Sequence, residues 1–296
     1  CHYKGVPNDQ DLWDSLHLAR CAVNAETMQW DKHKIVKTNN PKTVHIIGGG
    51  IGGMEAALVC AKRGHKVDLY EKGDKLGGVF IAAAAPSFKE KDRDLIAWYI
   101  RELSKYPEIN VHMNSEVKDI NALGADEIIV ATGAKAKRIP VKGVETAIEA
   151  VDFLLGKKEV GENVTIIGGG LTGCEIAYEL YLQGKKPTIV EMMDDLIVTK
   201  GICLANTSYL RDCFKTNKVP VHLETALCEI KENAVTVKDK EGKTFDIPSD
   251  SVIMSVGYNP APLAPKAKNV HVIGDAAKVG NLRTVIWGAW DVAMKL

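Results

Sequence analysis

The chain has 296 residues, and its 38 Lys and Arg balance its 38 Asp and Glu, so the formal net charge is zero. A length above the roughly 100–200 residues of one domain predicts two hydrophobic cores, and without a basic excess no nucleic-acid or acidic-membrane partner is expected. Seven cysteines without a CxxC pair, no signal peptide and no apolar run of the roughly 20 residues that cross a bilayer predict a cytoplasmic protein with free thiols.

Residues 1–39 are polar and show no sustained periodicity of apolar side chains. They are expected to form an extended arm outside both domains. The first residue is a cysteine, and residues 289–296 read as the middle of a helix. We therefore expect the chain to be a fragment of something longer.

An internal repeat organises the rest of the chain. The run Thr43–Gly53 recurs, with the same order of apolar residues and glycines, as Asn163–Gly173. Each copy opens with a short β-branched run, continues as an alanine-rich helical pattern and ends in a second apolar run. The helical patterns and second runs are Met54–Arg63 with Lys66–Tyr70, and Cys174–Gln183 with Pro187–Val190. Strand, helix and strand in this order predict a parallel sheet with a right-handed crossover.

Further strands are predicted after the second copy. They cover Val219–Thr225, Glu229–Val237 and Phe245–Met254, with Lys240–Lys243 as the hairpin turn between the last two. Antiparallel strands should therefore decorate the second unit. Pro260–Pro265 marks the linker by which the chain returns to the first.

The first copy matches the pattern G-x-G-x-x-G where a strand turns into a helix. Gly48 is expected to make the tight turn, Gly50 to let the backbone approach a pyrophosphate, and Gly53 to let the helix close on the strand. The phosphates would then sit on free amides at the helix N-terminus. Glu71 ends the second strand, near the ~20 residues after the first glycine at which a carboxylate accepts hydrogen bonds from a ribose.

The second copy repeats this arrangement in full. Its expected ligands for NAD(H) are Gly168, Gly170, Gly173, Glu191 and Gly257. One fingerprint alone would also fit a plain structural corner, but two complete copies predict two nucleotide sites. The predicted fold class is α/β, with two Rossmann-like dinucleotide-binding domains whose parallel sheets carry antiparallel additions.

Three further motifs decide which site takes FAD. Leu76-Gly77-Gly78 comes after the first acid, Ala131-Thr132-Gly133 comes after the apolar strand Glu127–Val130, and Ile273-Gly274-Asp275 precedes a closing helix. A flavin and its ribityl chain need close backbone approach and one carboxylate for the ribityl hydroxyls. Only the first copy has these motifs, so the expected FAD ligands are Gly48, Gly50, Gly53, Glu71, Gly77, Gly78, Thr132, Gly133, Gly274 and Asp275. Taken alone, Asp275 would equally fit a cap of the closing helix.

These assignments give the expected domain limits. Residues 1–39 form the arm, residues 40–145 and 260–296 the FAD-binding domain, and residues 146–259 the NAD(H)-binding domain. The second site should prefer NADH over NADPH, because Glu191 is followed by Asp194 and Asp195 with no arginine nearby, so that a 2′-phosphate would meet carboxylates. Lys200 could still accommodate NADPH if it folds back.

These residues resemble the two-dinucleotide-binding flavoproteins, and within them the C-terminal half of the 2-enoate reductase, 2,4-dienoyl-CoA reductase and trimethylamine dehydrogenase family, iron–sulfur flavoproteins of the old yellow enzyme-like group. The likeness runs from about Cys21 to the end. Its most specific part is Cys21-Ala-Val-Asn24, which is similar to the last cysteine of the family's iron–sulfur motif and the segment next to it. The resemblance implies an N-terminal FMN barrel, as a missing half or a partner chain. A homo-oligomer is also compatible with the sequence.

The iron–sulfur motif departs from the family pattern. The family supplies four closely grouped cysteines, whereas this chain offers only Cys1 and Cys21 in that region, so a complete cluster is not predicted. Cys1 is either an earlier ligand or an unrelated thiol, and Cys21 is either a ligand or a small buried hydrophobe. Glu175 comes after the second fingerprint, where related flavoproteins often have a glutamate near the nicotinamide; a favourable charge at the helix N-terminus is the alternative.

The resemblance implies an NADH-dependent oxidoreductase. Hydride would pass from NADH to FAD, and electrons would continue through an iron–sulfur cluster to FMN, where an activated alkene of the 2-enoate or enoyl-CoA type is reduced. A stand-alone NADH:acceptor oxidoreductase is a first alternative, although Val79–Ala85 contains none of the redox cysteines that a disulfide reductase would have there. A non-catalytic module that binds an ADP moiety is a second.

Overall fold

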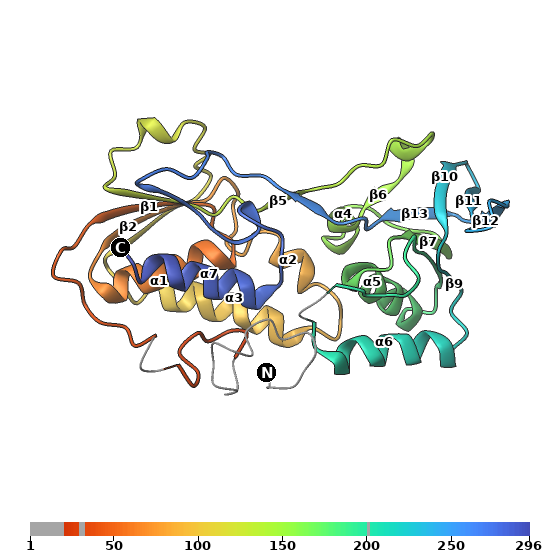
Figure 1. Cartoon of the computed structure of the whole chain (residues 1–296), viewed down its shortest axis with the longest axis horizontal. Helices are drawn as coiled ribbons and strands as arrows, with labels where there is room; N and C mark the ends of the chain where they lie inside the picture. The colour runs from red at the N-terminus through yellow and green to blue at the C-terminus, as the bar shows by residue number, and fades with distance from the viewer. Residues whose placement is uncertain (1–20, 30–32, 200–201) are drawn as a thin grey trace. The chain divides into compact units, whose positions relative to one another are not determined.

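The computed structural model describes residues 21–29, 33–199 and 202–296 (Figure 1). These residues form two compact units. The first comprises the described residues up to Ile81 together with Glu90–Lys135 and Asn259–Leu296. The second comprises Ala82–Lys89 and Ala136–Tyr258. Each unit contains one copy of the internal repeat.

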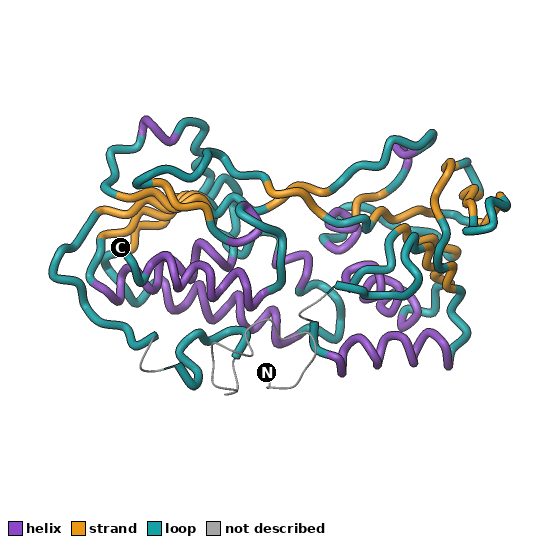
Figure 2. Tube along the Cα trace, in the orientation of Figure 1, coloured by secondary structure: helices purple, strands orange, loops and turns teal. Residues whose placement is uncertain are grey.

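The first unit is built on a five-stranded parallel sheet in the order β15-β4-β1-β2-β3. The strands are β1 (Thr43–Ile47), β2 (Lys66–Tyr70), β3 (Ile109–His112), β4 (Glu127–Val130) and β15 (Val270–Val272). Helices α1 (Ile51–Arg63), α3 (Glu90–Leu103) and α7 (Leu282–Ala293) lie together on one face of this sheet, as Figures 1 and 2 show. The short helices of this part of the chain are α2 (Phe80–Ala83), η1 (Ile120–Ala122) and η3 (Gly274–Ala276).

The core of the first unit lies between the sheet and these helices. Small residues of α1, such as Ala56, Ala57 and Cys60, are fully buried and let α7 approach closely. Gly64 ends α1 in the left-handed conformation, with φ +97°, and its amide bonds back to the last turn. Helix α1 therefore packs against the sheet with α7 beside it.

The second unit contains a five-stranded parallel sheet in the order β6-β13-β7-β8-β9. Its strands are β6 (Ile148–Glu149), β7 (Asn163–Ile167), β8 (Lys186–Val190), β9 (Val221–His222) and β13 (Ser251–Met254). Its helices are η2 (Val144–Thr146), α4 (Ala150–Leu154), α5 (Leu171–Leu182) and α6 (Leu204–Thr216). An antiparallel sheet is formed by β10 (Ala226–Ile230), β11 (Ala234–Lys238) and β12 (Thr244–Pro248). Strands β5 (Ala134–Ala136) and β14 (Tyr258–Pro260) pair where the chain passes from one unit to the other.

The predicted α/β class is confirmed, with parallel sheets and an antiparallel addition. Both repeats fold as predicted into strand, helix and parallel strand, β1-α1-β2 and β7-α5-β8. Turn formation in the predicted hairpin is also confirmed, because the Asp239 amide donates to the Lys243 carbonyl at 3.0 Å between β11 and β12.

The predicted strand Val219–Thr225 is shorter than expected, because only Val221–His222 form β9, which pairs in parallel with β8. Two other predicted strands are also wrong in their extent. Glu229–Val237 contains a turn, closed by the Lys231 amide on the Ala234 carbonyl at 2.8 Å, and therefore belongs to two strands, β10 and β11. Phe245–Met254 is likewise interrupted after Pro248, and its second part, β13, returns to the parallel sheet. In both cases polar residues between the apolar ones, such as Asn233 and Asp250, mark the turns.

The two ends of the chain also differ from expectation. Residues 1–20 and 30–32 lie outside the described part, but Ala25 is fully buried in the core of the first unit, so this part of the arm does not lie outside the domain. The indole of Trp287 donates to the Cys21 carbonyl at 3.0 Å. The reading of residues 289–296 as the middle of a helix is wrong, because α7 ends at Ala293 and residues 294–296 do not continue it. The docking of residues 21–29 at the other end of the chain could not be recognised from the sequence, because this short segment shows no helical or strand periodicity.

Candidate functional site

In the first unit β1 turns into α1 at a glycine corner. Gly48 has φ +109°, and a Cβ there would lie 2.4 Å from the Ala131 carbonyl oxygen. A Cβ at Gly53 would lie 1.9 Å from the Gly48 oxygen. Gly50 is different, because the nearest atom to its added Cβ is Gly78 Cα at 4.0 Å. Two of the three glycines are thus required by the packing of the corner, while the third leaves the N-terminus of α1 open.

The second unit repeats this corner between β7 and α5. Gly168 has φ +108°, and a Cβ there would lie 2.2 Å from the Ser255 oxygen. A Cβ at Gly173 would lie 2.0 Å from the Gly168 oxygen, whereas Gly170 has nothing within 4 Å of an added Cβ. Gly170 also precedes the first turn of α5 with no side chain capping it. Each corner therefore offers free helix amides next to open space, the arrangement that binds a pyrophosphate.

The acid after each second strand folds back onto its corner. Glu71 accepts hydrogen bonds from the Gly49 amide at 2.8 Å and the Gly73 amide at 2.7 Å. Glu191 accepts from the Gly169 amide at 2.5 Å and the Met193 amide at 2.8 Å. A carboxylate oxygen has two acceptor positions, so each acid retains acceptor capacity for the hydroxyls of a ribose. The residues of both corners fit a dinucleotide.

The Leu76-Gly77-Gly78 loop lies against the first corner. The Gly77 amide donates to the Gly49 carbonyl at 2.8 Å, and Gly77 and Gly78 have φ values of +120° and +58°. A Cβ at Gly78 would lie 3.1 Å from Gly50 Cα. The structure thus brings Gly50, Gly77 and Gly78 together, and larger residues would close the space beside the open glycine.

Thr132 and Gly133 come after β4, on the same edge of the sheet as the corner. The Thr132 hydroxyl donates to the Ala261 carbonyl at 2.8 Å, and Gly133, with φ +73°, accepts from the Ala261 amide at 3.1 Å. The Thr132 hydroxyl thus binds the segment by which the chain returns to the first unit. No atom lies within 4 Å of a Cβ built at Gly133, so the space beside this glycine is open.

Asp275 lies in η3, after Gly274, whose φ is +58°. It does not cap the closing helix α7: the cap is Asn281, which accepts from the Thr284 amide at 3.0 Å in a capping box. The capping alternative is therefore wrong for that helix. Burial raises the pKa of Asp275, opposed by a hydrogen bond from the Gly280 amide at 3.0 Å. This carboxylate retains acceptor positions for hydroxyl groups.

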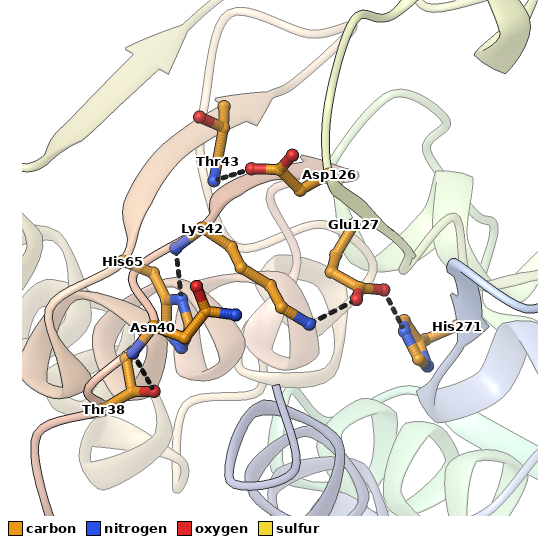
Figure 3. A network of polar contacts seen from close by, with 8 residues as sticks. All are labelled: Thr38, Asn40, Lys42, Thr43, His65, Asp126, Glu127 and His271. Carbon is orange, nitrogen blue, oxygen red and sulfur yellow. Dashed lines mark hydrogen bonds and ion pairs between the residues drawn. The ribbon is translucent and has the colours of Figure 1, made fainter.

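A charged network occupies the opposite edge of the same sheet (Figure 3). Glu127, at the start of β4, accepts from Lys42 Nζ at 2.6 Å and lies 2.8 Å from His271 Nε2. Asp126 accepts from the Thr43 amide at 2.8 Å. These contacts join the amino-terminal ends of β1 and β4 to β15, which places them away from the glycine corner at the carboxyl ends of the strands. We assign them a structural role.

Two expected NAD(H) residues have partners that the sequence did not indicate. Glu175, on α5, forms an ion pair with Lys89 at 2.7 Å, both side chains being about 15% exposed. Gly257, with φ +89°, accepts from the Lys137 amide at 2.9 Å and lines a small hollow together with Met254, the last residue of β13. Lys89 is far from Glu175 in sequence, so no local pattern signals this pairing.

The expectation that no arginine lies near the second acidic segment is wrong. Arg211, on α6, approaches Asp195 with its guanidinium, at 2.9 Å between NH2 and Oδ2. Lys200, the other cation considered, lies outside the described residues. Helical periodicity places Arg211 on α6, but nothing local shows which loop that helix faces.

The described residues add no support to the expected iron–sulfur ligands Cys1 and Cys21. Cys21 is half-buried, Cys1 lies outside the described part, and no group of three His, Cys, Asp or Glu side chains that could hold a metal ion occurs within residues 21–29, 33–199 and 202–296. No helix within the same ranges combines the length and apolar character needed to cross a membrane.

Curated proteins resemble this chain in sequence. Cinnamate reductase from Clostridium sporogenes is 39% identical over 285 residues, which cover 93% of this chain and 42% of that protein. NADH oxidase from Thermoanaerobacter brockii is 33% identical over 304 residues, covering 96% of this chain and 46% of that protein. These identities confirm the likeness to the 2-enoate reductase group. The chain spans less than half the length of both curated relatives.

Solved structures agree. A 2-naphthoyl-CoA reductase in complex with 2-naphthoyl-CoA matches with a TM-score of 0.85 at 26% identity, over 93% of this chain and 43% of that one. Thioredoxin reductase from T. acidophilum matches with a TM-score of 0.69 at 20% identity, over 86% of this chain and 97% of that one, which shows the shared fold. A family model described as pyridine nucleotide-disulphide oxidoreductase, which implies binding of FAD and NAD(P)H, matches residues 42–284. The chain therefore belongs to the pyridine nucleotide-disulphide oxidoreductase family.

Proposed function

We propose that this chain is an NADH-dependent flavoprotein module that binds FAD at the corner of the first unit and NAD(H) at the corner of the second. The observation that supports this most directly is the duplicated corner, in which Gly50 and Gly170 leave a helix N-terminus open while the glycines around them are packed. FAD when bound supplies an acceptor for the hydride of NADH and can release electrons singly.

The residues of the chain have separate tasks in this proposal. The amides next to Gly50 and Gly170 at the start of each helix hold phosphates, and Glu71 and Glu191 orient the riboses. Gly77, Gly78, Thr132, Gly133, Gly274 and Asp275 are the proposed surroundings of the flavin and its ribityl chain, and Gly173, Gly257 and Glu175 those of the nicotinamide nucleotide. Their common effect is orientation, which lowers the entropic part of the barrier.

We further propose that electrons leave through an iron–sulfur cluster, with Cys21 and Cys1 among its ligands, to FMN in a barrel that this chain lacks. The substrate proposed there is an activated alkene of the 2-enoate or enoyl-CoA type. Relatives named cinnamate reductase and 2-naphthoyl-CoA reductase support this class, since each name describes reduction of an unsaturated acid or its thioester. The shared coverage of less than half of those proteins supports a separate region for that step.

A stand-alone NADH:acceptor oxidoreductase is a second candidate, supported by the relative named NADH oxidase. Cys60 and Cys174 are unsuited to a thiol-based version, because burial raises the pKa of both thiols to about 12. The two candidates differ in where electrons go after the flavin and share the same proposed sites.

The proposal is tested by incubating the purified chain with FAD, FMN and ADP together, identifying the nucleotide that it retains, and measuring NADH-dependent reduction of a one-electron dye. We expect the chain to retain FAD rather than FMN. Gly50→Ala should lose the flavin, whereas Gly170→Ala should keep the flavin and lose activity with NADH. A folded chain that retains no flavin after incubation would contradict the proposal, and one that retains only ADP would favour the non-catalytic module.

A further inference from the structure

The loop between β8 and α6 is built onto the second glycine corner. The Ile197 amide donates to the Gly169 carbonyl at 2.8 Å, and Leu196 Cδ2 lies 2.5 Å from the position of a Cβ on Gly169. At the other end of this loop Glu191 accepts from the Gly169 amide. Residues 191–197 therefore form the wall of the corner on the side where the ribose of the nucleotide is proposed to lie.

Arg211 reaches this wall from α6 and is engaged by it. Its Nε donates to Asp195 Oδ1 at 3.1 Å, and its NH2 lies 2.9 Å from Oδ2 and donates to the Leu196 carbonyl. Asp195 Oδ1 also accepts from the Leu196 amide at 2.7 Å. A two-point contact of this kind fixes the plane of the guanidinium and offsets its charge.

Opposite charges gather at this end of α5. Burial raises the pKa of the Cys174 thiol to about 12, and Arg211 lowers it while Glu191, Glu175 and Asp195 raise it. The thiol therefore lies within the electrostatic reach of both the arginine and the ribose-binding acid. An arginine so placed is the type of residue that accommodates a 2′-phosphate.

We propose that Asp195 determines the preference for NAD(H) over NADP(H), by holding Arg211 against the Leu196 carbonyl and cancelling its charge. This inference rests on the proposed NAD(H) site. With Asp195 in place, a 2′-phosphate meets Glu191 and an arginine that is already paired. Without the carboxylate, the guanidinium has unused donors beside the loop that begins with Glu191. In this proposal Arg211 could bind the 2′-phosphate of NADP(H), but its ion pair with Asp195 prevents this.

The test measures binding rather than turnover. The affinities of 5′-AMP and adenosine 2′,5′-bisphosphate are determined by calorimetry for the wild-type chain, Asp195→Asn, and the double variant Asp195→Asn with Arg211→Gln. In Asp195→Asn we expect the bisphosphate to bind about tenfold more tightly, as one new charge-assisted contact provides, with the affinity for 5′-AMP unchanged. In the double variant this gain should disappear.

Asp194→Asn is the matched control. It removes the same charge one residue away, and within the described chain Arg211 is paired with Asp195 rather than with Asp194. A similar gain in Asp194→Asn, or a gain that survives in the double variant, would show a general effect of charge and overturn the inference. Asp195→Ser removes the same carboxylate and must reproduce the gain, and thermal unfolding of each variant reports any loosening of the loop.

The result also separates this inference from the function on which it depends. If the wild-type chain binds neither 5′-AMP nor NADH, the proposed NAD(H) site itself is wrong and the inference falls with it. If the wild-type chain binds both and Asp195→Asn gains nothing for the bisphosphate, the site stands and only the role of Asp195 is overturned.

Discussion

Two neighbouring glycines of the second corner respond in opposite ways to one added methyl group. A Cβ at Gly173 would lie 2.0 Å from the Gly168 oxygen, so Gly173→Ala forces α5 away from β7 and should destabilise the fold by about 1–3 kcal/mol. Gly170 has φ −67° and open space, so Gly170→Ala should leave stability nearly unchanged and weaken binding of NADH. Denaturant unfolding and NADH titration of both variants separate the two effects; equal losses of stability would contradict the account.

A buried acid gives the first unit a specific pH dependence. Glu55, on α1, accepts from the Tyr99 hydroxyl at 2.9 Å, and burial raises its pKa from 4.5 to about 7, against the opposing effects of Tyr99 and Lys62. The folded state thus binds this proton more tightly than the unfolded chain does. Its contribution to stability is fully present below pH 4.5 and is lost as the pH rises to about 7.

Glu55→Gln should remove this dependence, because an amide keeps the acceptor for Tyr99 and cannot ionise. We expect the variant to gain stability relative to the wild type as the pH rises from about 4.5 to about 7, by roughly 3 kcal/mol in all. Free energies of unfolding measured across this range test it. A stability difference between the two proteins that does not change with pH would show that Glu55 titrates as an ordinary carboxyl.

The glycines of the two corners are more readily predicted than the residues that surround them. Gly48, Gly53 and their counterparts are recognisable because the chain itself closes around them, within a few residues in sequence. Arg211 and Lys89 were missed because each meets its acid only through the packing of α6 or of residues 82–89 within the second unit. A long-range ion pair leaves no pattern in the sequence that encodes it.

At the scale of elements, the β-α-β repeats were predictable because a short apolar run ending in glycines is followed by an alanine-rich helical pattern and a second apolar run. The antiparallel strands were harder to predict from the sequence. The segment from β10 to β13 consists of short apolar runs separated by two or three polar residues, and such runs fit one bent strand as well as two separate ones. The hydrogen bonds between strands decide where each strand ends. One of them runs from the Ser249 amide to the Asn233 carbonyl at 3.0 Å.

The network around Glu127 ties three strands of the first sheet. Burial acts to raise the pKa of Glu127, but hydrogen bonds from Lys42 and His271 hold it below its usual value. A hydrogen bond to a charged group contributes about 1.5–3 kcal/mol, so Glu127→Gln should destabilise the protein by about that amount at neutral pH. Because the folded-state pKa is the lower one, this contribution is present above the unfolded carboxyl pKa and is lost as the pH falls.

The measurement is the unfolding free energy of Glu127→Gln at neutral and acidic pH. Its control is Glu116→Gln, since Glu116 is 58% exposed and its lysine partner is 3.9 Å away, and this variant should change stability by no more than about 0.5 kcal/mol. A Glu127→Gln variant that resembles the control at neutral pH would show that the network of Figure 3 does not stabilise the sheet.

At the scale of the whole molecule, family and fold class could be predicted from the sequence because the repeat gives two complete nucleotide-binding corners. The place of the described N-terminal residues could not, since Ala25 joins the core of the first unit through a single small side chain. The chain covers only 42% and 46% of the two curated relatives named above.

The central claim is that the two corners serve one electron transfer. Its most direct test is anaerobic mixing of the FAD-loaded chain with NADH, followed at the visible absorption of the flavin. We predict that the absorption bleaches in proportion to the NADH added, and that Gly170→Ala, which keeps its flavin, bleaches only with dithionite. A wild-type chain whose flavin stays oxidised in excess NADH, but is reduced by dithionite, would contradict the account.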